Sequence, residues 1–210
     1  MKILSFDMET NGLWGKAFAI GAVILDVDEE NYPGEWHRLI GDDFAFPVPD
    51  PEEVLKIHCQ IDGEVDPFVK ENVLPNIDFS GYKEVSDYKE LVRTFIDWYK
   101  EMKAKYSNEL KIIVHCGLPV EVNLFIDAHK FGMIGDFDHP FPLIDIASFP
   151  EIGTSIDDYL KEKIGSVTYT QHDPVEDSLF AAYAYIFWLY DNSYIDIDVA
   201  FDVFWDRMNN

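Results

Sequence analysis

Two acidic residues lie two positions apart at the end of a short apolar run near the start of the chain. Residues 3–6 are apolar enough to form a buried strand, and Asp7 and Glu9 follow. Side chains at i and i+2 of a strand share a face, so these carboxylates would lie ~7 Å apart. At ~7 Å and an effective dielectric constant of ~20, two negative charges repel by roughly 2.4 kcal/mol. A divalent cation such as Mg²⁺ would remove that repulsion. Solvent exposure of both acids before a turn is the alternative.

A histidine and a third acid lie near the other end of the chain. Asp173 fits the N-cap of a helix, Pro174 its first position and Glu176 a capping-box partner, so helix formation alone explains these three. Asp177 is different, because helical spacing places it on an apolar stripe with Phe180, Ala181, Ala184 and Trp188. A carboxylate there requires a metal or an opposite charge. His172 precedes this helix in a loop, where a histidine is more often simply solvated.

A fourth acid, Glu121, follows the expected strand 111–115 and opens the expected helix 120–131. Taken alone, it is explained by the favourable interaction of an acid with the N-terminus of a helix.

The elements that must position these residues form an α/β pattern. We expect strands at 3–6, 17–27, 35–46, 111–115 and 141–145, and helices at 51–57, 86–106, 120–131 and 174–190, with a loop over 64–82. This order predicts a mixed five-stranded sheet, with three antiparallel strands first and parallel strands after, flanked by helices. We expect one domain over 1–210 with a core at about 3–190. Residues 193–210 form a tail or a further helix.

Three segments resemble the motifs of a known family. Residues 6–13 (FDMETNGL) resemble the first motif of the DEDD, or DnaQ-like, 3′–5′ exonucleases, which have a ribonuclease H-like fold. His172 and Asp177, with four residues between them, resemble the third motif of the DEDDh branch. Residues 113–117 (IVHCG), with an acid six positions after His115, are similar to the second motif. The spacing is more like that of the three-prime repair exonucleases than that of the polymerase proofreading subunit.

This resemblance implies a catalytic site. Asp7, Glu9, Glu121 and Asp177 would hold two Mg²⁺ or Mn²⁺ ions, and His172 would take the proton from the attacking water.

Within the same resemblance, four residues near the first motif would bind substrate. The backbone of Met8 and Thr10 would meet the 3′-hydroxyl, Leu13 would wedge against the terminal bases, and Trp14 could stack on one of them. Ordinary packing is the alternative for Leu13 and Trp14.

The chain departs from the family at two positions. The family has Asp where this chain has Glu121, and usually Asn where it has Cys116. The extra methylene of Glu121 moves the carboxylate by about one C–C bond, and Mg²⁺ requires near-ideal geometry. Slow or altered activity is therefore a second expectation. Asp127 and Asp145 are nearby acids; we expect the first to be solvated and the second to cap the segment after the fifth strand.

The composition limits the class of partner. The 210 residues include 16 Lys and Arg against 40 Asp and Glu, which gives a net charge of −24. A field of that sign repels polyanions, which argues against broad duplex binding through a basic face. We expect a short, single-stranded 3′ end as substrate, with no membrane partner; a homodimer is compatible with the chain. No apolar run reaches the ~20 residues of a membrane span, and with no evident signal peptide and two cysteines we expect a cytoplasmic protein.

Three alternatives remain open from the sequence. The first is a catalytically weakened nucleic-acid- or protein-binding module on the same scaffold. The second is an acidic decoy that mimics nucleic acid and blocks a basic partner; such a protein has no use for acids in apolar surroundings. The third is a ribonuclease H-like endonuclease, against which the His172 and Asp177 pair argues.

Overall fold

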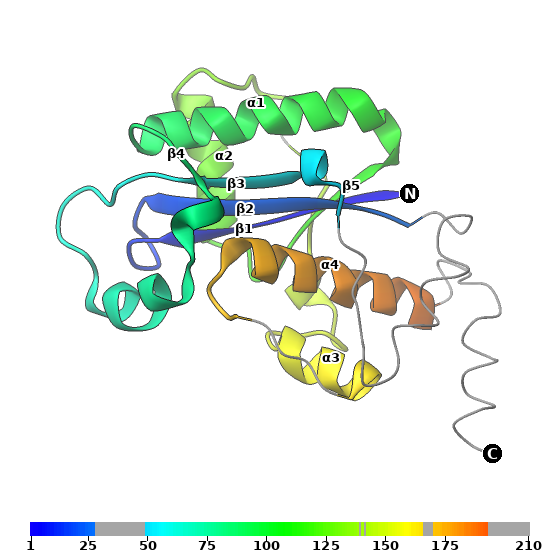
Figure 1. Ribbon diagram of the computed structural model, residues 1–210. Helices are drawn as coiled ribbons and strands as arrows, with labels where there is room; N and C mark the ends of the chain where they lie inside the picture. Colours follow the sequence, from blue (N-terminus) through cyan, green and yellow to red (C-terminus); the bar gives the residue numbers. More distant parts are fainter. Residues whose placement is uncertain (28–48, 139, 141, 166–169, 193–210) are drawn as a thin grey trace, which may run out of the picture.

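The acidic residues belong to a mixed sheet that has six strands in the part of the chain that the structure describes. This computed structural model describes residues 1–27, 49–138, 140, 142–165 and 170–192. The strand order is β4-β3-β2-β1-β5-β6 (Figure 1). The strands are β1 (Lys2–Thr10), β2 (Ala17–Asp26), β3 (Val54–His58), β4 (Lys83–Glu84), β5 (Leu110–Val114) and β6 (Leu143–Asp145). The helices are α1 (Tyr88–Tyr106), α2 (Val120–Lys130), α3 (Ile156–Ile164) and α4 (Pro174–Asp191).

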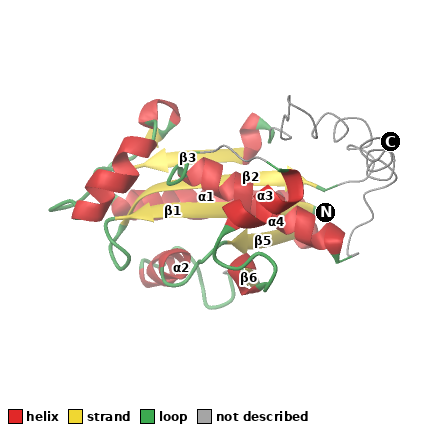
Figure 2. Cartoon of the chain, turned by 90° about the horizontal axis from the view of Figure 1, so that it is seen from below, coloured by secondary structure: helices red, strands yellow, loops and turns green. Residues whose placement is uncertain are grey.

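Helices cover both faces of the sheet, α1 and α2 on one side and α3 and α4 on the other (Figures 1 and 2). Alternation along β1 decides which residues meet which helices, because successive side chains of a strand point to opposite faces. Leu4, Phe6 and Met8 belong to the apolar cluster that contains α1 and α2 residues. Ile3 belongs to the cluster built on α3 and α4. The odd-numbered side chains of β1, including Asp7 and Glu9, therefore face α4.

The pairing of the strands opens the sheet beside the acidic residues. β1 pairs antiparallel with β2 along its whole length. On its other edge it pairs parallel with β5 only from Lys2 to Ser5. β5 in turn pairs parallel with β6. The second half of β1 thus extends past the end of β5, at the carboxyl edge where open α/β sheets commonly form a crevice.

α4 packs closely against the middle of the sheet at one glycine. A Cβ atom on Gly21 of β2 would overlap the backbone of Pro174 and Val175 at the start of α4. The hydroxyl of Ser178 donates to the carbonyl of Gly21 at 3.0 Å. This contact fixes the first turn of α4, which carries Asp177, against the sheet.

The mixed sheet flanked by helices that the sequence predicts is confirmed, with six described strands in place of five. The predicted strand 35–46 and the tail 193–210 lie outside the described residues. The predicted helix 51–57 is wrong. A single 3-10 turn begins there (η2, Pro51–Glu53), capped as expected by Asp50, but residues 54–58 then pair with β2 as β3. Helix α3 and strand β4 were not predicted.

The remaining described segments are short helical turns. They are Val69–Val73 (η3), Leu74–Asn76 (η4), Phe79–Gly81 (η5), Ser107–Glu109 (η6) and Ile146–Ser148 (η7). Among the described helices, none has the length and apolar character needed to cross a membrane.

The close contact at Gly21 generates a stability prediction. Gly21→Ala should lower the free energy of unfolding by about 1–3 kcal/mol, because the added methyl group forces α4 away from β2. Urea denaturation measures the change. Gly81→Ala is the matched control, since a Cβ atom there meets no atom within 4 Å. Equal stability of the two variants would contradict the tight contact.

Candidate active site

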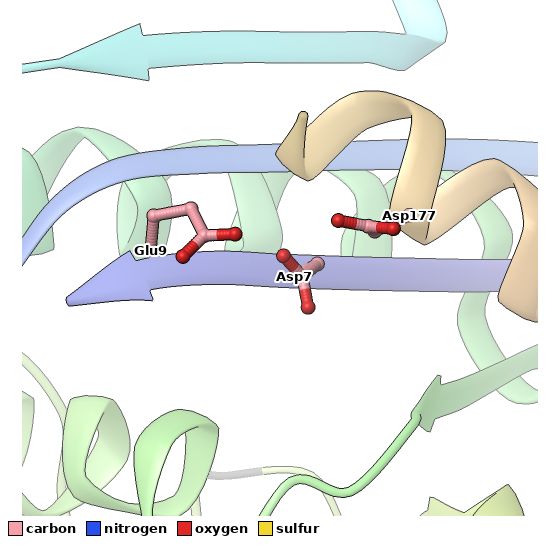
Figure 3. Close-up of side chains that lie close together, drawn as sticks. All are labelled: Asp7, Glu9 and Asp177. Atoms are coloured by element: carbon pink, nitrogen blue, oxygen red, sulfur yellow. The ribbon is translucent and has the colours of Figure 1, made fainter. Parts of the chain in front are cut away.

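The first two carboxylates of the site come from β1. Asp7 and Glu9 lie on the strand face that meets α4, and Figure 3 shows their side chains beside the helical turn that carries Asp177. One carboxylate oxygen from each of these three residues lies within 4.8 Å of the other two. The structure therefore brings together three of the four acids that the sequence indicated. The outermost of these residues, Asp7 and Asp177, are 170 positions apart in the sequence.

The start of α4 is held by Asp173. Its Oδ1 accepts hydrogen bonds from the backbone N–H groups of Val175 at 3.0 Å and Glu176 at 3.2 Å, as an N-cap does. The same oxygen accepts from the hydroxyl of Tyr82 at 3.0 Å. The carboxylate of Glu176, which the sequence predicted as a capping-box partner, accepts a hydrogen bond from the backbone N–H of Thr170. These contacts fix the residue that follows His172.

His172 bridges β1 and α4. Its Nδ1 lies 3.2 Å from Oε1 of Glu9, and its backbone N–H donates to Oδ2 of Asp177 at 2.9 Å. The φ angle of His172 is 68°, a left-handed conformation that a non-glycine residue adopts only when its surroundings impose it. The edge of its ring also packs against Phe68, with 6.1 Å between centroids. The histidine that the sequence places in a loop is thus held by three residues, Glu9, Asp177 and Phe68.

Glu121 lies in the same cavity but outside the group of three. It occupies the first turn of α2 and is only 3% exposed. The backbone N–H groups of Met8 and of Glu121 itself face the Glu121 carboxylate. Its charge acts on Asp7, which places the two carboxylates near each other. The longer side chain in place of the family's aspartate still reaches the cavity from α2.

Burial and mutual repulsion raise the pKa values of these acids. Burial raises the pKa of Asp7 well above its usual range, and the charges of Asp177, Glu121 and Glu9 raise it further. Burial also raises the pKa of Glu121 to about 8 and that of Asp177 to about 8. Each carboxylate is therefore unfavourable in its charged form unless a cation is near.

Glu9 and His172 form a partly compensated pair. Burial raises the pKa of Glu9, while the hydrogen bond from His172 opposes that change. The same hydrogen bond raises the pKa of His172 above its ordinary value, against the effect of its partial burial. The imidazole is therefore a stronger base than a solvated histidine.

These side chains line one cavity of about 410 Å³. Its described lining includes no Lys or Arg, but it includes five acids, which are Asp7, Glu9, Glu121, Asp157 and Asp177. Carboxylate oxygens are the ligands that Mg²⁺ and Mn²⁺ prefer. A set of partly or fully buried carboxylates with raised pKa values, lying close together beside His172, fits a divalent metal ion.

Of the four predicted substrate-binding residues, one lines the cavity and three do not. Met8 lines the cavity through its backbone, while its side chain is buried on the other face of the sheet. Thr10 closes the turn after β1 by donating to the carbonyl of Gly12 at 2.9 Å. Leu13 and Trp14 are 61% and 77% exposed, so ordinary packing does not explain them. Thr10, Leu13 and Trp14 are not among the residues that line the cavity.

The two nearby acids have structural partners. Asp145 caps the turn at Ile146–Ser148, as predicted, by accepting from the backbone N–H of Ala147 at 3.1 Å. Asp127 is not simply solvated, because it accepts from the hydroxyl of Tyr88 at 2.8 Å and from Lys130 at 2.8 Å.

One wall of the cavity was missed by sequence reasoning. Ser155 and Asp157, at the start of α3, line the cavity together with His115. His115 Nε2 lies 3.0 Å from the carbonyl oxygen of Gly153, and burial lowers the pKa of this histidine. A signal for α3 was present, because Ser155 and Asp158 have capping-box spacing, and the Ser155 side chain accepts from the N–H of Asp158 at 3.3 Å.

Comparison with known proteins places the fold. No family model matches the chain, and no match is found among curated proteins. The solved structures do include similar folds. Pop2p of S. pombe, in its Mg²⁺ and Mn²⁺ bound form, has a TM-score of 0.56 at 12% identity, over 90% of this chain and 82% of that one. The nuclease domain of 3′hExo, a DEDDh family member bound to rAMP, has a TM-score of 0.56 at 14% identity, over 90% and 91%.

The chain shares its fold with Pop2p and with the nuclease domain of 3′hExo. By the sequence resemblance to the DEDDh motifs, Asp7, Glu9, Asp177 and His172 have the residue types of the first and third motifs. Glu121 takes the place of the remaining Asp, and Cys116 that of the usual Asn. The sequence resemblance and the fold comparison therefore agree on the architecture. The two departures of the sequence from the family pattern lie in the loop after β5 (Cys116) and in the first turn of α2 (Glu121).

The raised pKa values predict how stability depends on pH and metal. Without metal, Glu121 and Asp177 keep their protons in the folded state up to about pH 8, whereas the unfolded chain ionises them near pH 4. The folded state therefore binds more protons between these values, and stability falls as pH rises from about 4 to about 8. Because a metal ion requires the ionised carboxylates, Mn²⁺ should raise Tm more at pH 8 than at about pH 5.5.

Thermal melts of chelator-treated protein with and without Mn²⁺ measure this difference. Asp177→Asn should reduce the response to Mn²⁺ and remove the Asp177 part of the pH dependence, leaving the part due to Glu121. Asp97→Asn removes the same charge from an exposed side chain of α1 that does not line the cavity, and it should leave both unchanged. An equal shift in Tm at the two pH values would contradict the predicted coupling.

Proposed function

We propose that the protein is a metal-dependent 3′–5′ exonuclease. It would hydrolyse phosphodiester bonds at the 3′ end of short single-stranded DNA or RNA and release nucleoside 5′-monophosphates. One observation carries the proposal: Asp7, Glu9 and Asp177 converge within 4.8 Å, with His172 bonded to Glu9, on the fold of a DEDDh nuclease. The Pop2p structure contains Mg²⁺ and Mn²⁺, and the 3′hExo structure contains rAMP, a nucleotide of the class proposed here as product.

Asp7, Glu9, Asp177 and Glu121 would hold Mg²⁺ or Mn²⁺, two ions in the family pattern. When bound, such ions make a nucleophile from water and stabilise negative charge on the phosphate and the leaving oxygen. Glu9 has a second task, because it accepts the Nδ1–H of His172 and so selects the tautomer of the ring. That bond leaves Nε2 to accept a proton from the attacking water.

Leu13 and Trp14 would contact the bases of the terminal nucleotides from the turn after β1. Both are largely exposed apolar side chains, and stacking on Trp14 requires a base with an uncovered face. Such contacts favour a single-stranded end. The homodimer and the cytoplasmic location stay predictions from the sequence.

Glu121 supports a second candidate function. Its carboxylate is not in the group of three within 4.8 Å, although it lines the same cavity. A site with one displaced ligand could bind a metal ion and a nucleic acid end without cutting it. The alternative is therefore a catalytically weakened binding module on this scaffold. The decoy interpretation is disfavoured, because Glu121 is buried and Asp7 half-buried in one cavity, so these acids are not spread over an exposed face.

Labelled oligonucleotides test the proposed activity. DNA and RNA strands labelled at either end, incubated with Mg²⁺ or Mn²⁺, should lose nucleotides stepwise from the 3′ end. Asp7→Asn should abolish the reaction, and Asp136→Asn, which lies outside the cavity, should not. A circular single strand should survive; its cleavage would indicate an endonuclease. Metal binding without shortening of any strand would favour the binding module.

His172 provides an independent test of the chemistry. His172→Ala should lower kcat by about 10²- to 10⁴-fold, the usual contribution of a general base. Binding of Mn²⁺ should remain, because the three converging carboxylates are still present. Unchanged kcat would exclude the proposed role of the imidazole.

The lack of Lys and Arg in the described cavity lining predicts weak dependence on salt. A protein that neutralises few phosphates releases few counterions, so KM should rise little between about 50 and 200 mM salt. Digestion of a long strand should be distributive, with dissociation after few cleavages. The product distribution at early times shows this. Tight, processive digestion at moderate salt would contradict the expected short substrate.

A further inference from the structure

Asp145, at the end of β6, joins two loops at the carboxyl edge of the sheet. Its Oδ1 accepts hydrogen bonds from the backbone N–H of Cys116 at 3.0 Å and of Ala147 at 3.1 Å. Its Oδ2 accepts from the backbone N–H of Gly117 at 3.0 Å. One carboxylate thus binds three backbone donors, two of them in the loop after β5. The role of Asp145 as the cap of the turn at Ile146–Ser148 explains only its contact with Ala147. It does not explain the two contacts with the loop after β5.

The loop that Asp145 holds has an unfavourable backbone conformation. Cys116 has a φ of 57°, in the left-handed region that costs a non-glycine residue free energy. Gly117 has no space for a side chain, because a Cβ atom there would overlap the side chain of Val114. Such a turn persists only when its surroundings over-determine it. The two hydrogen bonds to Asp145 supply that restraint.

The same loop begins the helix that carries Glu121. The carbonyl of Gly117 accepts from the N–H of Val122 at 3.1 Å, and the carbonyl of Pro119 accepts from that of Asn123 at 3.0 Å. A Cβ atom on Gly117 would lie 3.6 Å from Oε2 of Glu121, so the loop borders that carboxylate directly. A displacement at Gly117 therefore moves both the first turn of α2 and the space around Glu121.

A carboxylate is an electrostatically unfavourable choice at this position. The charge of Asp145 adds to the repulsion on Glu121. An asparagine would avoid that repulsion, but it offers one acceptor oxygen, and its amide N–H groups would face the backbone donors. Only a carboxylate presents two acceptor oxygens to the two successive N–H groups of the loop. The two hydrogen bonds to the loop therefore explain why an acid stands at position 145, although its negative charge repels that of Glu121.

We propose that Asp145 is a positioning residue that holds the Glu121 carboxylate in the metal-binding cavity through the loop at Cys116 and Gly117. This inference rests on the proposed function, in which Glu121 is a metal ligand. Residues that orient the ligands of a metal typically contribute about 10- to 100-fold in metal affinity.

Mn²⁺ binding, measured by electron paramagnetic resonance without substrate, tests the inference. Asp145→Ser keeps a good cap for the turn at Ala147 but cannot hold both N–H groups of the loop. Asp145→Asn is the second variant. Each should weaken Mn²⁺ binding by about 10- to 100-fold. The matched control is Asp50→Ser, because Asp50 also caps a 3-10 turn, accepting from Glu52 at 2.9 Å, outside the cavity. It should leave the affinity unchanged.

A double-mutant cycle separates positioning from a general structural role. If Asp145 acts through Glu121, Asp145→Ser should change Mn²⁺ affinity by less than about twofold in a Glu121→Gln background. Hydrogen exchange at Cys116 and Gly117 in the metal-free protein should also become faster in Asp145→Ser. Equal losses in both backgrounds would overturn the inference, as would unchanged affinity in Asp145→Ser.

These outcomes are distinct from failure of the proposed function. If the unsubstituted protein binds no Mn²⁺, the metal-dependent function is wrong, and the inference falls with it. If it binds Mn²⁺ and the Asp145 variants bind as tightly as Asp50→Ser, the inference alone is wrong.

Discussion

Repulsion among carboxylates is the constraint that the rest of this structure must overcome. Asp7, Glu9 and Asp177 would separate if each were free, because each is partly desolvated and each raises the cost of ionising the others. Packing keeps them together. The sheet fixes the first two on one face of β1, and the contact between Gly21 and the start of α4 brings the third. The molecule thus uses the free energy of its two apolar clusters to maintain an arrangement that is unfavourable in itself.

The loops around the cavity also help to hold its side chains in place, because their backbone is restrained. His172 and Cys116 are both non-glycine residues with positive φ, and both lie at its wall or next to it. Each is bound through its backbone N–H by a carboxylate of another segment, Asp177 for the first and Asp145 for the second. At these two positions, strained backbone lies where chemical groups must be aimed, and hydrogen bonds to carboxylates stabilise it.

Much of this arrangement could be predicted from the sequence, and the failures have physical causes. Alternation along β1 indicates that Asp7 and Glu9 share a face, and helical spacing places Asp177 on a buried stripe. The helix expected at 51–57 failed because Asp50 and Pro51 start a turn, but pairing with β2 then competes successfully for residues 54–58. The contacts of Tyr82 with Asp173 and of Asp145 with Cys116 join distant segments, and no local pattern encodes them.

The residues that meet in the cavity lie far apart in the sequence, and this has a consequence for biosynthesis. Glu9 and His172 bond across 163 positions, and α4 is the last described helix. A growing polypeptide exposes the first acid pair early, yet it lacks the histidine and the third acid until translation has passed α4. Any chemistry of the completed cavity is consequently absent from a growing chain that has not yet reached α4. Premature termination upstream of α4 would leave a fragment with neither the histidine nor the third acid.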